Sequence, residues 1–150
     1  MTWTSKPITS AWDHQNLLRA IERARSSWLT YAPFLDLFSA RLRRSRIVPP
    51  TEVPSDMITM NSRFVLEDRR TGERTTCTLV YPQEESPRMG MVSVLSPMGT
   101  AVLGARVGEE VCWTSAVGPE LARVEDLLYQ PEWTRRQPPA PVEPPETGRN

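Results

Sequence analysis

The chain has 150 residues, 39% of them apolar and 7% aromatic, which is enough for one ordinary domain with a modest core. Its 18 basic and 18 acidic side chains cancel, so net charge gives no argument for general binding to nucleic acid or to membrane surfaces. No segment approaches the roughly 20 apolar residues that cross a bilayer, and the first residues lack a signal-peptide apolar region. We therefore expect a cytoplasmic protein with no membrane partner.

The first 48 residues predict two short helices. Ser10 followed by Asp13 is typical of a helix start, because the serine side chain can accept a hydrogen bond from a backbone N–H of the first turn. Apolar residues then recur at helical spacing as far as Trp28. Pro33 suits the first turn of a second helix, whose apolar stripe ends in a basic turn. We expect residues 1–48 to form an antiparallel helical hairpin, or short coiled coil.

Prolines and alternating apolar residues divide the next part of the chain. The prolines at positions 49, 50 and 54 cannot continue a helix, so residues 49–54 are predicted to be a semi-rigid linker. Apolar residues alternate over 58–66, a turn follows near Gly72, and 76–81 return with a β-rich pattern, which predicts a β-hairpin. Residues 82–90 are polar and rich in turn formers, as in a loop.

Residues 91–113 predict a strand, a short helix, a glycine turn and another strand. The first strand, Met91 to Leu95, is expected to be central. Ser96 can cap the short helix, Pro97 fits its first position, and Gly104 can end it with a positive φ. The second strand runs through Val111 and Trp113.

The end of the chain predicts one more strand and a tail. Leu121, Leu127 and Tyr129 are expected to share one face of a strand that lies toward a sheet edge. The tail is rich in proline and poor in apolar residues, so it cannot offset its ordering entropy. We expect an α+β fold, with an antiparallel sheet domain at residues 55–132 and a disordered tail at 133–150.

The sequence lacks the parts of a catalytic or metal site. His14 is the only histidine, and it lies where a solvated surface position is expected. Cys77 and Cys112 have no neighbouring ligand at metal-binding spacing, so we expect both to be buried reduced thiols. No catalytic residue, metal or cofactor is predicted.

Four ordered motifs give the chain a specific resemblance. Together they resemble the C-terminal domain of the Gre family of transcription elongation factors, and most of all its Rnk type, known as regulators of nucleoside diphosphate kinase. The resemblance implies an FKBP-like sheet domain behind an N-terminal coiled coil. The motifs are residues 53–63, 79–82, 96–113 and 127–132.

The resemblance also implies a docking site for RNA polymerase. In the family, a Ser-Pro segment before a short helix docks on a coiled coil at the rim of the polymerase secondary channel, and the matching residues here are Ser96, Pro97, Met98 and Gly99. Cleavage factors have an acidic residue just before this serine, whereas this chain has Leu95. An apolar contact would replace a charge-assisted one. The plain alternative is that Ser96 and Pro97 only start a helix.

The hairpin tip differs from that of cleavage factors. Those factors hold Mg²⁺ with paired carboxylates, whereas this tip offers Trp28, Tyr31 and only Asp36 as a carboxylate. The resemblance therefore does not extend to transcript cleavage. The two aromatic residues fit either core packing or exposed contacts with a partner.

Four arginines gather near the end of the second predicted helix. They can complement the helix dipole on a solvated face, or contact an acidic surface or nucleic-acid phosphate weakly. The four are Arg41, Arg43, Arg44 and Arg46.

We consider three classes of function. The first is a monomeric, non-enzymatic regulator that binds RNA polymerase at the secondary channel rim and competes with cleavage factors. The second is an adaptor that regulates nucleotide metabolism, at the level of nucleoside diphosphate kinase, through another protein. A prolyl isomerase ranks third, because fold alone does not carry function.

Overall fold

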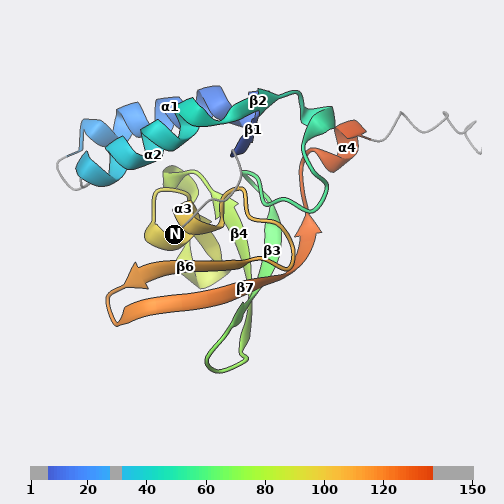
Figure 1. The fold of residues 1–150 in the computed structure, drawn as a ribbon. Coiled ribbons are helices and arrows are strands. Elements are labelled where there is room, and N and C mark those ends of the chain that lie inside the picture. Colours follow the sequence, from blue (N-terminus) through green and yellow to red (C-terminus); the bar gives the residue numbers. More distant parts are fainter. Residues whose placement is uncertain (1–6, 28–31, 137–150) are drawn as a thin grey trace, which may run out of the picture.

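The computed structural model describes residues 7–27 and 32–136 of the chain. Its elements follow in chain order as β1 Ile8–Ser10, α1 Ala11–Arg25, α2 Ala32–Arg44, β2 Arg46–Val48, β3 Arg63–Asp68, β4 Arg74–Val80, β5 Met91–Ser93, α3 Pro97–Val102, β6 Glu110–Ser115, β7 Gly118–Tyr129 and α4 Trp133–Arg136. In Figure 1, α1 and α2 lie side by side along one end of the sheet domain, and α3 lies between them and β6. The predicted α+β fold class, a sheet domain combined with helices, is confirmed.

Five strands form the main sheet, in the order β5-β4-β3-β7-β6. β3 and β4 pair as the predicted antiparallel hairpin, with Phe64 opposite Cys77. The expectation of a wholly antiparallel sheet is wrong, because β5 pairs parallel to β4 and lies at an edge rather than in the centre. β7 was expected near an edge, but it lies between β3 and β6.

The prediction that Leu121, Leu127 and Tyr129 share one face of β7 is wrong for a local reason. Its register against β3 shifts twice, between Arg63 and Phe64 and between Val65 and Leu66, so strict alternation is broken. Val124 and Leu127 are buried, whereas Leu121 and Tyr129 are both more than 40% exposed. A one-residue shift reverses which side chains face the core.

One hydrophobic core joins the helices to the sheet. The stripes predicted to bury against each other instead pack together with the sheet domain, since Leu17 of α1 and Phe38 of α2 belong to the same buried cluster as Phe64 and Leu79. Burial of a large apolar side chain contributes about 1.5–3 kcal/mol. The helices are therefore held by the core of the domain as well as by each other.

The expected linker is also anchored. β1 and β2 form a small parallel sheet in which Ile8 pairs with Arg46. Val48, Val53 and Met57 form a second buried cluster beside it. The predicted linker is therefore held at Val53, which is buried, whereas Pro49, Thr51 and Glu52 of the same segment are exposed.

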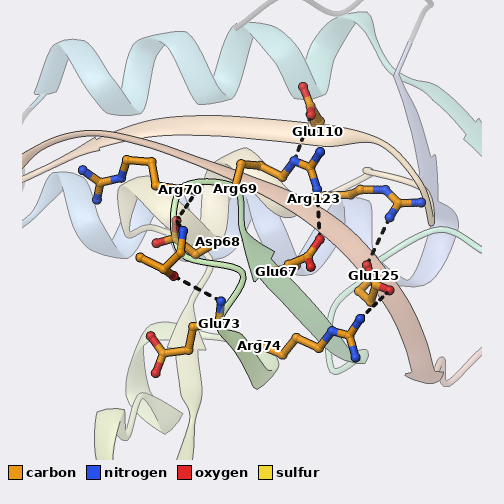
Figure 2. A network of polar contacts seen from close by, with 10 residues as sticks. Glu67, Asp68, Arg69, Arg70, Glu73, Arg74, Glu110, Arg123 and Glu125 are labelled. Atoms are coloured by element: carbon orange, nitrogen blue, oxygen red, sulfur yellow. Dashed lines mark hydrogen bonds and ion pairs between the residues drawn. The ribbon is translucent and has the colours of Figure 1, made fainter.

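The outer face of the main sheet carries alternating charges. Arg74, Glu67, Arg123 and Glu110 stand opposite one another in a row across β4, β3, β7 and β6. Figure 2 shows the ion pairs of this face: Arg69 lies 2.9 Å from Glu67 and 3.2 Å from Glu110. Arg74 and Arg123 both pair with Glu125, at 3.3 and 3.2 Å. Cross-strand pairs of opposite charge stabilise a sheet modestly. Because these charges are matched within the chain, this face is a weak candidate for binding a charged partner.

The two cysteines differ in environment. Cys77 is buried in the core, as predicted, and burial raises the pKa of its thiol. Cys112 is exposed, which contradicts the expectation, because it alternates with the buried Val111 on edge strand β6. Within the described residues, no helix is long and apolar enough to cross a membrane.

Candidate functional site

The predicted start of the short helix is confirmed. The Ser96 side chain accepts a hydrogen bond from the Gly99 backbone N–H at 3.0 Å and donates one to the Ser93 carbonyl at 2.7 Å. Pro97 occupies the first turn of α3, where a missing N–H costs nothing, and its ring is exposed. The helix start therefore presents a rigid apolar ring to solvent.

Gly99 has a packing role that the motif alone does not reveal. A Cβ atom at this position would lie 1.9 Å from the Ser93 carbonyl oxygen and 2.8 Å from the Val94 Cα. Only glycine allows α3 to approach the β5 end so closely. Gly99 is buried, and Met98 is half-buried against the core, so Leu95, Ser96 and Pro97 supply the accessible part of the motif.

Arg41 does not belong to an exposed basic patch. Its guanidinium is buried and donates hydrogen bonds to the carbonyls of Thr100, at 2.8 Å, and Leu103. These carbonyls lie at the C-terminal end of α3, where backbone acceptors lack helical partners. Burial lowers the pKa of Arg41 to about 10. Arg41 thus joins α2 to the helix that follows the Ser-Pro segment.

The other three arginines of the predicted patch remain at the surface. Arg43, Arg44 and Arg46 are exposed, and within the described part of the chain none has an ion-pair partner within 4 Å. Residues 7–48 contain seven arginines and three carboxylates, whereas residues 49–136 contain nine arginines and thirteen carboxylates. The zero net charge therefore conceals a basic helical part and an acidic sheet part.

A groove separates α1 from the Ser-Pro segment. Its volume is about 650 Å³, and apolar atoms predominate on its walls. Residues from four parts of the chain line it: Ala20, Arg23 and Ala24 of α1 with Ser27 just beyond its end, Phe34 of α2, Pro82, Gln83 and Glu85 of the loop after β4, and Ser93, Leu95, Ser96 and Pro97. The predicted docking residues thus form one wall of a hollow whose other wall is helical. The sequence did not indicate the α1 wall, since its pairing with residue 97 spans more than 70 positions.

The predicted tip is described only in part. Trp28 and Tyr31 lie outside the described residues. Asp36 is exposed, and its carboxylate forms a 2.9 Å ion pair with Arg25 at the end of α1. Among the described residues, no group of three or more His, Cys, Asp or Glu side chains is arranged to hold a metal ion.

The C-terminal motif fastens the linker to the sheet. The Gln130 amide, fully buried, donates to the carbonyls of Pro54 at 2.9 Å and Met57 at 2.7 Å. The Trp133 indole N–H donates to the Ser55 carbonyl at 2.9 Å. α4, Trp133–Arg136, thus packs beside the linker just after the predicted domain, which was bounded at residue 132.

Two buried carboxyl groups lie where α1 meets the sheet domain. The Asp13 carboxylate accepts a hydrogen bond from the Met60 N–H at 3.2 Å, and the Glu132 carboxylate accepts one from the Thr59 hydroxyl at 2.8 Å. Burial raises the pKa of Asp13 to about 7, and the charge of Glu132 adds to the rise. The hydrogen bonds from Met60 and Ser10 oppose it. The sequence identified Asp13 only as part of a helix start, because its burial depends on residues far along the chain.

Comparison with known proteins identifies the family of this chain. The family model described as transcription elongation factor GreA/GreB, C-terminal, matches residues 53–129, more than half of the chain. The chain belongs to the GreA/GreB family. The resemblance to the Gre family is therefore confirmed, and its Rnk type is confirmed by the relative described next.

Relatives and a solved structure cover different shares of the chain. A regulator of nucleoside diphosphate kinase from Escherichia coli strain K12 is 39% identical over 101 residues, or 67% of this chain and 74% of the relative. Elongation factor GreA from Sulfurovum sp. strain NBC37-1 is 33% identical over 87 residues, or 58% of this chain and 54% of that factor. A GreA/GreB structure from Nitrosomonas europaea has a TM-score of 0.70 and 29% identity, covering 84% of this chain and 100% of the solved one. The match to this GreA thus spans about half of that factor.

Proposed function

We propose that this protein is a non-enzymatic transcription regulator that binds RNA polymerase at the rim of the secondary channel. Membership of the GreA/GreB family supports the general role. The main observation in favour of this binding site is the exposed Ser96-Pro97 helix start on the wall of a groove of about 650 Å³. Pro97 is rigid and apolar, so little conformational entropy is lost when a partner covers it.

The proposed arrangement is an FKBP-like sheet domain that carries a short helical hairpin. α1 and α2, with 15 and 13 residues, are about 22 and 20 Å long at 1.5 Å per residue. We propose that this blunt hairpin occupies the channel entrance and excludes cleavage factors. The exposed Arg43, Arg44 and Arg46 would add weak contacts with nucleic-acid phosphate. The protein would act as a monomer.

Transcript cleavage is not part of the proposed activity. A hard divalent cation needs several oxygen ligands. Asp36 has no second carboxylate within residues 27–35 of the sequence, and its own charge is paired with Arg25. The proposal is therefore binding and competition without chemistry.

A competition experiment tests this function. Labelled cleavage factor is bound to core RNA polymerase, and the present protein is titrated into the complex. Displacement with a single saturating stoichiometry, and no short 3′ fragments from halted complexes in Mg²⁺, is the expected result. Simultaneous binding of both proteins, or Mg²⁺-dependent fragment release, would contradict the proposal.

The adaptor function has less support than polymerase binding. A relative is named as a regulator of nucleoside diphosphate kinase, but this name concerns the relative, and no contact or charge feature described above favours the adaptor over polymerase docking.

A further inference from the structure

The groove beside the Ser-Pro segment has a helical wall with its own pattern. Ala20, Arg23 and Ala24 of α1 line it, together with Ser27, which lies two residues beyond the end of the helix. The three helical positions, at i, i+3 and i+4, lie on one face of α1. Two alanines of α1 and the serine that follows the helix leave space there, so the hollow arises from these small side chains as much as from the Ser-Pro segment.

Arg23 gives this wall a charge that the chain does not neutralise. It is exposed, and within the described part of the chain no carboxylate lies within ion-pair distance of it. Its neighbour Arg25 differs, because it pairs with Glu22 and Asp36. The other side of the groove carries Glu85. The basic charge is thus confined to the α1 wall.

We propose that α1 forms the second half of the polymerase-docking site, and that Arg23 selects a partner helix carrying a carboxylate on the side that faces α1. This inference rests on the proposed function and extends it, because the motif alone places the interface at residues 95–99. The occupant is the polymerase helix that meets Pro97. Its apolar side chains enter the groove between Ala24 and Leu95, as an amphipathic helix enters a groove. A pocket of this size admits several side chains.

Filling the groove tests the inference directly. Ala24→Trp places a large ring in the hollow, whereas Arg19→Trp places the same ring on α1 at an exposed position that does not line the groove. Affinity for core RNA polymerase is measured for both variants, with circular dichroism and thermal unfolding as checks of folding. We expect Ala24→Trp to weaken binding about tenfold or more, the effect of a damaged interface anchor, and Arg19→Trp to bind as the unmodified protein does.

A charge reversal provides a second test if the tryptophan at position 24 disturbs folding. Arg23→Glu should weaken binding about tenfold, and the difference from the unmodified protein should shrink at high salt. Arg19→Glu makes the same charge change one turn earlier and should have little effect.

The outcomes separate this inference from the proposed function. If Pro97→Asp loses binding while Ala24→Trp and Arg23→Glu bind normally, the α1 wall is not part of the interface and the inference is wrong. If the unmodified protein itself does not bind core polymerase, the proposed function fails first, and the inference fails with it.

Discussion

Replacing Asp13 with asparagine changes how the stability of this protein depends on pH. The folded-state pKa of Asp13 is raised from 3.8 to about 7, chiefly by burial and next by Glu132. The folded protein therefore holds a proton that the unfolded chain releases, and the free energy of unfolding falls as pH rises from about 4 through 7. Each pKa unit corresponds to 1.36 kcal/mol. Between pH 5 and pH 8, the free energy of unfolding falls mainly over the two pH units from 5 to 7, which lie below the folded-state pKa. The total loss is therefore about 3 kcal/mol.

Asparagine cannot titrate, and its side-chain oxygen can still accept the hydrogen bond from the Met60 N–H. We expect urea unfolding to show a drop of about 3 kcal/mol between pH 5 and pH 8 for the unmodified protein, and a nearly flat profile for Asp13→Asn. Asp36→Asn is the control, since this exposed carboxylate should leave the slope in place. Glu132→Gln removes the second cause of the raised Asp13 pKa, so the fall in the free energy of unfolding should occur at lower pH. Equal slopes in the unmodified protein and Asp13→Asn would refute the reasoning.

Three further changes test other parts of the structure. Gly99→Ala should lower the free energy of unfolding by more than about 3 kcal/mol, because its Cβ would overlap the Ser93 carbonyl; an unchanged urea midpoint would show that α3 shifts freely. Arg41→Met should cost about 3 kcal/mol by leaving buried carbonyls of α3 unpaired, whereas Arg43→Met should cost under about 0.5 kcal/mol at its exposed position. Removing residues 137–150 should leave the thermal midpoint nearly unchanged, and a fall of several degrees would mean that the tail packs on the domain.

Features that depend on neighbouring residues could be predicted from the sequence. The caps at Ser10 and Ser96 and the positive φ of Gly104 all follow from interactions within a few positions, and all are confirmed. The β3–β4 hairpin has the same local origin. Such signals fix where elements begin and end.

Features that depend on distant residues could not be predicted in the same way. Arg41 was expected in a basic patch, because nothing near it in sequence shows that its partners lie 59 and 62 positions away. The position of β7 toward a sheet edge was predicted wrongly for the same reason, since β7 pairs with β3 across more than 50 positions. The proposed docking residues were suggested by the motif, but the groove beside them exists only once α1 packs against the sheet domain.

The affinity of folded Pro97→Asp for core RNA polymerase tests the central claim most directly. An acidic residue suits the start of a helix, so α3 should form normally, while the charge enters a contact from which water is excluded. The account predicts circular dichroism like that of the unmodified protein and a loss of about 1–3 kcal/mol in binding, or roughly 5- to 150-fold. Unchanged affinity in the folded variant would contradict the account and move the interface away from the Ser96-Pro97 segment.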